Sequence, residues 1–548
     1  MKVLFLFFNH PATPFNTSVA ALSGVVRDAG HERASLSVLI GEPLEGPAER
    51  VRAAEADVIA VSAMTRDWPH AQALLEMIGP GPRCVVGGYH ASLVPREVAG
   101  CDRVDAVCIG DGERPLRAIL DGFPETSIPG LWVRGPDGFP EILPPPDPEP
   151  DIAALPAWDY DVFGGVPEIL DFGVNTFGPL VDRYLPTRAG RGCPFRCAYC
   201  TAPVWGEVTG VTKSRNVRPV EHLCDELAAL RDAYAPDGFE FWDEHFPVDP
   251  SWLESFAELY PKRVGLPFKV EMHPNAATRA RLTLLRHAGC RLFHCGVEAG
   301  DSALRRDTLN RRTSDTVLER VFADARELGI ETSASVMTAV PGETYAQARK
   351  TVALLRHLSP DSFMWSTFMT LPRTVLGEQL IDHEGPVSAM SEAERHLIHA
   401  ELSALQKELV GRASTGRPKS RTRRVAVPSP PIELPIDQAA ADPVFDGALA
   451  RAVAERLSLG LPEAATSSRL SVERAEWSGG ELLVLVGAAE VAPHVISIAP
   501  ADGQPAFRTN AALRFSHRGS TAAPEVLSLL RRLSEELDAA DFMALQSD

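Results

Sequence analysis

The chain has 548 residues, of which 45% are hydrophobic and 23% are charged, and its formal net charge at pH 7 is −19. This length predicts about three or four domains of roughly 150 residues each. The negative charge argues against a nucleic-acid partner, because phosphate binding needs a basic surface. No apolar stretch approaches the ~18 residues that span a bilayer, and the cysteines do not suggest a disulfide framework. We therefore expect a cytoplasmic protein without a membrane or nucleic-acid partner.

Residues 1–138 alternate short apolar runs with helical patterns. This alternation predicts an α/β fold in which parallel strands and helices form a doubly wound, Rossmann-like sheet. The strand-like runs are residues 2–8, 57–63, 83–89 and 105–112, and the helical patterns are residues 18–29, 68–78 and 113–120. Ligands of such sheets bind at the carboxyl ends of the strands.

A proline-rich segment, residues 139–185, predicts a semi-extended linker. The alternation resumes over residues 186–410 with wider spacing and predicts a full or partial TIM-type βα barrel. Its strand-like runs are residues 238–246, 267–274, 292–300, 331–340 and 362–371. The chemistry of such a barrel lies at the C-terminal ends of its strands.

The last part of the chain begins with a basic, proline-containing stretch, residues 411–436, which we interpret as a second linker. Residues 437–548 predict a small α+β domain of unknown role. Its helical patterns are residues 446–458 and 524–542, and its strand-like runs are residues 481–490 and 494–500.

Three cysteines lie close together in the stretch RGCPFRCAYC, with the spacing C-x3-C-x2-C: Cys193, Cys197 and Cys200. Thiolates bind zinc, copper(I) or iron–sulfur clusters. A structural zinc site needs a fourth ligand, which here only a distant residue such as Cys224, Cys295 or His245 could supply. A 4Fe-4S cluster explains why only three cysteine ligands are present, because its fourth iron can keep an exchangeable position.

The same stretch resembles the signature of radical S-adenosylmethionine (radical SAM) enzymes, C-x3-C-x-aromatic-C, with Tyr199 as the aromatic residue. The resemblance implies that SAM binds the fourth iron and is cleaved to a 5′-deoxyadenosyl radical. It also implies a set of SAM-binding residues at successive strand ends: Tyr199, Asp243, Glu244, Glu298 and Glu343. The alternative for each acid is a helix cap or a surface charge.

Several cations also lie near the cysteines in the sequence: Arg188, Arg191, Lys213, Arg215 and Arg218. They could steer an anionic group of SAM or of the substrate. Ordinary surface ion pairs are an equally good interpretation.

Glycines end two strands of the first domain, in the stretches VVGGYH and CIGDGE. By composition alone this could be a nucleotide-binding or purely structural domain. Together with the cysteine motif, however, residues 1–380 resemble the cobalamin-dependent radical SAM enzymes. The resemblance implies these cobalamin contacts: Asn9, His10, Ser62, Met64, Thr65, Gly87, Gly88, Tyr89 and Gly110. Because the D-x-H-x-x-G motif is absent, we expect no cobalt ligation by that motif, and we expect the cobalamin tail along the sheet edge.

The resemblance implies a methyltransferase that moves a methyl group from SAM through methylcobalamin to a substrate carbon, in specialised (natural-product) biosynthesis. Its partners would be a small-molecule or peptide substrate and an electron donor of the flavodoxin or ferredoxin type. The substrate would lie between the two α/β domains, roofed by the C-terminal domain. The alternatives are a non-methylating rearrangement or cyclisation, and a non-enzymatic cobalamin or iron–sulfur sensor.

Overall fold

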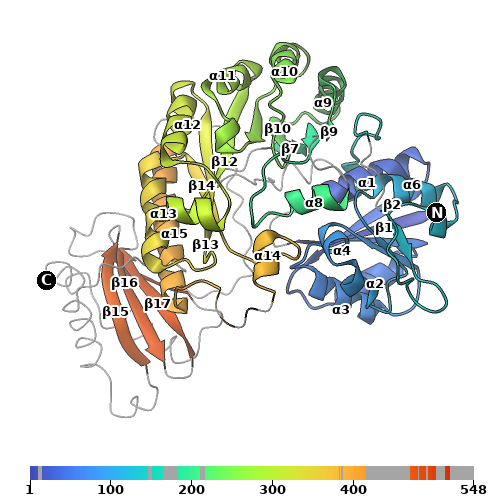
Figure 1. Ribbon diagram of the computed structural model, residues 1–548, viewed down its shortest axis with the longest axis horizontal. Helices are drawn as coiled ribbons and strands as arrows, with labels where there is room; N and C mark the ends of the chain where they lie inside the picture. Colours follow the sequence, from blue (N-terminus) through green and yellow to red (C-terminus); the bar gives the residue numbers. More distant parts are fainter. Residues whose placement is uncertain are drawn as a thin grey trace.

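The structure is a computed structural model, and it describes residues 1–9, 15–145, 151–164, 183–209, 216–381, 383, 385, 387–414, 470–478, 481–488, 491–500 and 513–518. Figure 1 shows an N-terminal α/β domain, a central barrel domain and a separate group of C-terminal strands. In these parts of the chain, no helix has both the length and the apolar character needed to cross a membrane.

The N-terminal domain is built on one six-stranded sheet with the order β2-β1-β3-β4-β5-β6. The first five strands in this order are parallel, and β6 is antiparallel to β5. The strands are β1 (Lys2–Asn9), β2 (Glu32–Leu39), β3 (Val58–Ser62), β4 (Arg83–Gly87), β5 (Ala106–Cys108) and β6 (Leu131–Val133). This order reverses direction between β1 and β3, and such a switch point leaves a crevice for a ligand at the strand ends.

Helices cover both faces of this sheet: α1 (Thr17–Asp28), α2 (Glu45–Ala53), α3 (Trp68–Ile78), α4 (Tyr89–Leu93), α5 (Pro95–Ala99) and α6 (Glu113–Leu120). The doubly wound fold is therefore confirmed. The sequence analysis missed β2, whose residues ERASLSVL are mostly half-buried at the sheet edge. Such a strand lacks the continuous apolar run by which buried parallel strands are recognised.

The central domain is a curled parallel sheet with the order β14-β13-β12-β11-β10-β7. Its strands are β7 (Tyr184–Thr187), β10 (Gly238–Phe241), β11 (Phe268–Glu271), β12 (Cys290–Glu298), β13 (Glu331–Thr338) and β14 (Ser362–Thr367). The helices α9 (Val220–Tyr234), α10 (Pro250–Arg263), α11 (Arg279–Ala288), α12 (Asp315–Glu327) and α13 (Tyr345–Leu358) lie on its outer side (Figure 1). The sheet has two open edges, so the barrel is partial.

Polar side chains fix where the barrel helices begin. The hydroxyl groups of Thr278, Ser314 and Thr344 each accept a hydrogen bond from a backbone N–H in the first turn of the following helix. Thr344 forms a reciprocal capping box with Gln347. These caps set the length of each loop between a strand end and its helix, and the strand ends carry the site residues.

The end of the first predicted linker is fixed to both domains. Asp159 is completely buried, accepts a hydrogen bond of 2.6 Å from Ser23 Oγ, and pairs with Arg27 and Arg33 of the N-terminal domain. The hydroxyl of the adjacent Tyr160 donates to the carbonyl of Pro186 in β7, at 2.7 Å. Residues 151–164 thus join the sheet of one domain to the first strand of the other.

Beyond the long helix α15 (Glu392–Ser414), the structure describes an antiparallel sheet with the order β15-β16-β17-β18. These strands are β15 (Leu470–Ser478), β16 (Glu481–Ala488), β17 (Val491–Pro500) and β18 (Leu513–Arg518). β16 and β17 are the two strands that the sequence predicts, whereas its two helices, residues 446–458 and 524–542, lie outside the described residues.

The position of this sheet differs from our expectation. In Figure 1 it lies beside α15, on the side of the barrel away from the N-terminal domain. The described strands therefore do not roof the region between the two α/β domains. The helix α15, which precedes these strands in the sequence, packs on α13 and β14.

Candidate active site between the two α/β domains

The three cysteines lie on the loop between β8 (Gly190–Arg191) and α8 (Ala202–Val208), which we call the cysteine loop. All three side chains are partly exposed. Two of the sulfurs accept hydrogen bonds: Cys197 Sγ from Arg311 Nη1 at 3.5 Å, and Cys200 Sγ from the backbone N–H of Ala202 at 3.4 Å. Hydrogen bonds to the ligand sulfurs are one of the means by which a protein tunes an iron–sulfur cluster.

The donor set fits a 4Fe-4S cluster better than a closed zinc site. Two of the three possible distant ligands, Cys224 and Cys295, are completely buried in the hydrophobic core of the barrel. The third, His245, is also buried, with its Nδ1 2.8 Å from the carbonyl oxygen of Phe246 and its ring beside Phe195. In the described part of the chain, no three His, Cys, Asp or Glu side chains converge on a single metal ion. Burial raises the pKa of Cys193 to about 11 and that of Cys200 to about 12, so both thiols must lose their protons when a metal binds.

Asp243 and Glu244, just beyond β10, hold the backbone that leads into the cysteine loop. The two oxygens of Asp243 accept the backbone N–H groups of Ala189, at 3.0 Å, and Gly190, at 2.6 Å. Burial raises the pKa of Asp243 to about 7. Glu244 accepts the N–H of Gly192 at 3.2 Å. Both side chains thus have a structural task, and Asp243, 2% exposed, has both oxygens engaged without any ligand.

Glu298 and Tyr199 are brought together by a residue that the sequence analysis did not single out, Arg311. Its Nη1 lies 3.6 Å from Glu298 Oε1 and 3.5 Å from both Tyr199 Oη and Cys197 Sγ, and its Nη2 donates to the carbonyl of Gly296 at 2.6 Å. A Cβ at Gly296 would lie 2.0 Å from Glu298 Oε1. Only glycine therefore leaves room for this group, which we call the Arg311 cluster.

The sequence alone did not identify the Arg311 cluster. Glu298 has a left-handed backbone, with φ of 67°, at the end of β12, which is uncommon for a residue other than glycine and typical of functional strand ends. Arg311 is one of five arginines among residues 305–320, and nothing in their pattern distinguishes the two that are buried, Arg305 and Arg311, from the others.

Glu343 remains within its own turn after β13. It is completely buried, and its Oε2 accepts the backbone N–H of Val340 at 3.2 Å. Burial raises its pKa to about 7. Its other oxygen, Oε1, is buried and has no hydrogen-bond partner among the described residues, so the contact of Glu343 with SAM stays a prediction.

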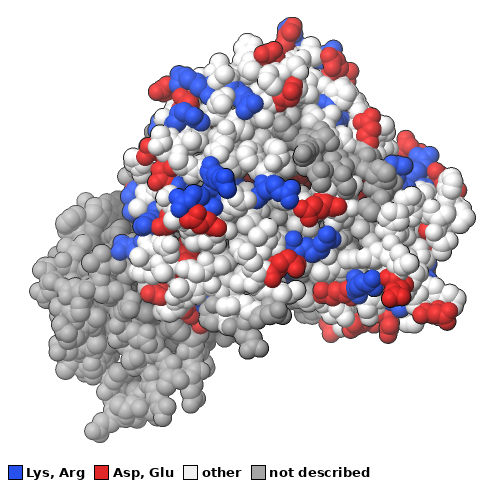
Figure 2. Space-filling view, in the orientation of Figure 1, with Lys and Arg blue, Asp and Glu red and all other residues white. Residues whose placement is uncertain are grey.

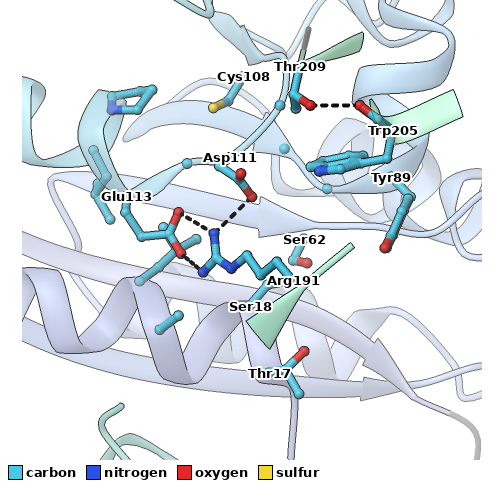
Figure 3. Close-up of a pocket in the computed structure, with 18 of the residues that line it drawn as sticks. Thr17, Ser18, Ser62, Tyr89, Cys108, Asp111, Glu113, Arg191, Trp205 and Thr209 are labelled. Atoms are coloured by element: carbon cyan, nitrogen blue, oxygen red, sulfur yellow. Dashed lines mark hydrogen bonds and ion pairs between the residues drawn. The ribbon is translucent and has the colours of Figure 1, made fainter. Parts of the chain in front are cut away.

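A cavity of about 370 Å³ lies at the junction of the two domains, and Figure 3 shows part of its lining. Five of the residues expected to contact cobalamin line it: Ser62, Gly87, Gly88, Tyr89 and Gly110. On the barrel side, the cavity reaches Cys193, Phe195 and Glu244. Asn9, Met64 and Thr65 are not part of the lining, and His10 lies outside the described residues.

The cavity continues as an apolar slot between the sheet and two helices. Its walls come from the strands (Phe5, Val58, Ala60, Val85), from α1 (Ala21, Leu22) and from α6 (Leu116, Ile119). The space available for a ligand tail therefore lies under one face of the sheet and not, as we expected, along its edge. The reason is that α1 and α6 stand far enough from the strands to leave the slot between them.

Glycine turns form the mouth of this slot. Gly88 has φ of 94°, and a Cβ there would lie 3.0 Å from the carbonyl oxygen of Ala63. Gly110 has φ of 90°. Tyr89, which follows Gly88, packs on Trp205 of α8 with a distance of 4.8 Å between ring centroids. A helix of the barrel domain therefore closes one wall of the mouth.

A polar link across the domain junction starts from Arg191 of β8, directly before the cysteine loop. Its guanidinium donates to Glu113 at 2.5 and 3.4 Å and pairs with Asp111 at 3.0 Å, as Figure 3 shows. The side chains of Arg191, Asp111 and Glu113 are 14%, 13% and 6% exposed. We call these three residues the Arg191 bridge.

The other predicted cations have separate partners. Arg188 pairs with Glu244 at 3.4 Å, and Arg218 pairs with Glu226 at 2.5 Å. Lys213 and Arg215 lie outside the described residues. Figure 2 shows basic (blue) and acidic (red) residues interspersed over the visible face, so the acidic residues do not form a single patch there.

Two family models match the chain at the two domains that form this site. The model of the B12 binding domain matches residues 11–120, and that of the Radical SAM superfamily matches residues 187–355. These domains imply cobalamin, and a 4Fe-4S cluster with SAM, as cofactors. The orphaned buried oxygen of Asp111, the glycine turns and the apolar slot fit a bound corrinoid, and the three thiols fit the cluster.

Among curated proteins, an anaerobic magnesium-protoporphyrin IX monomethyl ester cyclase from Cereibacter sphaeroides is 26% identical over 66% of this chain and 60% of its own length. A cytidylyl-2-hydroxyethylphosphonate methyltransferase from Streptomyces wedmorensis is 23% identical over 52% of this chain and 58% of its own length. The chain thus spans about 60% of the length of these curated relatives.

Two solved structures share the fold. The radical SAM methyltransferase TsrM from Kitasatospora setae, with cobalamin and a 4Fe-4S cluster bound, superimposes with a TM-score of 0.55 over 69% of this chain and 77% of its own, at 18% identity. The cobalamin-dependent radical SAM enzyme OxsB, with aqua-cobalamin bound, has a TM-score of 0.52 over 76% of this chain and 63% of its own, at 15% identity.

Proposed function

This chain is a cobalamin-dependent radical SAM enzyme, and from this premise we propose that it transfers a methyl group from SAM, by way of cobalamin, to a carbon atom of a small-molecule or peptide substrate. The observation that carries the proposal is the shared cavity, whose lining includes both the glycine turns of the B12 binding domain and Cys193 of the cysteine loop. A methyl carrier and a radical source must lie close together for such a reaction, because the substrate carbon has to reach both.

The cavity residues have distinct tasks in this proposal. The turns at Gly87, Gly88 and Gly110 let a flat ring approach the backbone closely, and the apolar slot between the sheet and α1 and α6 takes the nucleotide tail. Tyr89 and Trp205 help to exclude water at the mouth. When bound there, cobalamin supplies a cobalt centre that accepts and donates a methyl group.

The Arg311 cluster would bind SAM beside the cysteine loop. Glu298 can accept hydrogen bonds from an ammonium or a ribose hydroxyl, and Arg311 can donate to a carboxylate. Arg311 also donates to Cys197, so it would hold SAM and a ligand sulfur in one arrangement. Asp243 and Glu244 keep the approach to the cysteine loop in place through the backbone of residues 189–192.

A cyclisation or rearrangement is the second candidate outcome. The observation in its favour is the similarity to an anaerobic cyclase, which exceeds the similarity to the methyltransferase from Streptomyces wedmorensis. We favour methyl transfer because methyltransferases recur among the curated relatives, such as those from Streptomyces wedmorensis and Chlorobaculum tepidum. The natural-product role and an electron donor of the flavodoxin or ferredoxin type belong to the same proposal.

The experiment is an anaerobic assay of the purified protein with a reconstituted cluster. Its absorption spectrum is recorded with and without hydroxocobalamin, and the protein is then incubated with SAM, a reductant and candidate substrates. Methyl transfer predicts a product that gains one methyl group from isotopically labelled SAM. A product without the label, formed together with 5′-deoxyadenosine, would instead indicate the second candidate. If the protein binds no corrinoid, the proposal fails in both forms.

A further inference from the structure

The cavity wall contains one acidic oxygen for which the structure offers no partner. Asp111 uses Oδ1 to pair with Arg191 at 3.0 Å, whereas its Oδ2 is buried and has no hydrogen-bond partner among the described residues. A buried polar atom without a partner is costly and rare in native structures. Because Asp111 lines the cavity, a ligand in the cavity can provide the missing partner after a small side-chain adjustment.

The charge around this oxygen selects the kind of partner. The carboxylates of Asp111, Glu113 and Glu244 face the guanidinium groups of Arg188 and Arg191, so these five groups carry one net negative charge when all are ionised. Arg196 also lines the cavity, but its charge is balanced by its partner Glu207. An ionised carboxylate only accepts hydrogen bonds. The wall therefore favours a neutral group with N–H donors and disfavours an anionic group in the same position.

Related corrinoids differ in whether they carry neutral N–H donors or anionic groups on the ring. The ring side chains of cobalamin and cobinamide end in carboxamides, which have N–H donors, whereas those of cobyrinic acid end in carboxylates. We propose that Asp111 selects carboxamide-bearing corrinoids, its Oδ2 accepting a hydrogen bond from a ring carboxamide while Arg191 holds its other oxygen. This inference rests on the proposed function, because it requires a corrinoid in the cavity.

Arg191 makes Asp111 suited to this task. Since the guanidinium donates to Glu113 twice and pairs with Asp111, it keeps the Asp111 carboxylate at the cavity wall, where only a small adjustment brings Oδ2 to a ligand. Burial raises the pKa of Asp111 to about 6, which leaves most of the group ionised at pH 7.5 and therefore able only to accept.

The test compares two tail-less corrinoids, cobinamide and cobyrinic acid, on the full chain with a reconstituted cluster at pH 7.5. Binding is followed by the change in corrinoid absorption. The expected result is that the wild-type protein binds cobinamide at least tenfold more tightly than cobyrinic acid. In Asp111→Asn, which keeps the size and the Arg191–Glu113 contacts but adds an N–H donor, we expect this ratio to fall at least tenfold.

A control separates this effect from the overall charge of the protein. Glu76→Gln removes one negative charge from α3, where Glu76 accepts a hydrogen bond from Gln72 and does not line the cavity, and should leave the ratio unchanged. If Asp111→Asn does not fold, Asp111→Ser removes the charge without adding an amide, and the same fall in the ratio is expected.

The outcomes distinguish the inference from the function on which it rests. An unchanged ratio in the Asp111 variants, with hydroxocobalamin still bound, overturns the role of Asp111 and leaves the proposed function intact. If the affinity ratio falls equally in Glu76→Gln, the role of Asp111 is also overturned, because the preference would then follow the total charge of the protein. If the wild-type protein binds neither hydroxocobalamin nor cobinamide, the proposed function itself is wrong.

Discussion

Removing the guanidinium from the Arg191 bridge should destabilise the junction between the two domains. In Arg191→Met the side chain keeps much of its length, but Asp111 and Glu113 lose their partner in a junction where each is less than 15% exposed. Removing one partner of a buried ion pair typically costs about 3–5 kcal/mol, because a buried charge is left uncompensated. Burial raises the pKa of Asp111 to about 6, so that group can take up a proton, and we expect the lower end of the range.

The assay has two measurements. Thermal unfolding of the anaerobic, cluster-loaded protein should show a clear fall in the midpoint for Arg191→Met. The electron paramagnetic resonance spectrum of the reduced cluster should also change, because Arg191 lies two residues before Cys193 and fixes the start of the cysteine loop.

Arg196→Met is the matched control, because it removes an arginine from the cysteine loop, five residues after Arg191. Arg196 pairs with Glu207 at 2.9 Å, but both side chains are largely exposed. Such surface pairs contribute about 0–1 kcal/mol. If Arg191→Met is no less stable than Arg196→Met, the Arg191 bridge does not hold the domains together and our reasoning is refuted.

Four further predictions concern single residues. Cys193→Ala should abolish SAM cleavage and leave hydroxocobalamin binding intact; loss of both would show that the two domains do not divide the work as we propose. Arg311→Met should weaken SAM binding at least tenfold, since a hydrogen bond to a charged group contributes about 1.5–3 kcal/mol; an unchanged dissociation constant by equilibrium dialysis would contradict this. Ile119→Trp should fill the slot and weaken hydroxocobalamin binding more than binding of tail-less cobinamide, and equal weakening would place the tail elsewhere. For Glu343, burial raises the pKa from 4.5 to about 7, so its stabilising contribution is complete below pH 4.5 and is lost as the pH rises through about 7. Glu343→Gln should therefore gain thermal stability relative to the wild type at pH 8 but not at pH 5, and a gain that is independent of pH would refute this cause.

Much of the fold could be predicted because its signals are local. The barrel strands β10 to β14 are apolar runs between helical patterns, and each was found in the sequence within a few residues of its end. Edge strand β2 was missed because its residues are half-buried and largely polar. The position of the described C-terminal strands differs from the expectation, since the position of one domain relative to the others leaves no periodic signal in the sequence.

The candidate site divides in the same way. By itself, the sequence determined the cysteine motif and the glycine-bearing strand ends. Each lies within a few consecutive residues, and the residue types and their spacing indicate metal ligands in one case and tight turns in the other. Only the tertiary structure decided that Arg191 meets Glu113, 78 positions away, that Arg311 reaches Cys197, 114 positions away, and that the cavity continues under the sheet. Such contacts depend on how the helices and domains pack. The sequence contains many arginines and acidic residues, and nothing in it identifies which of them will pair.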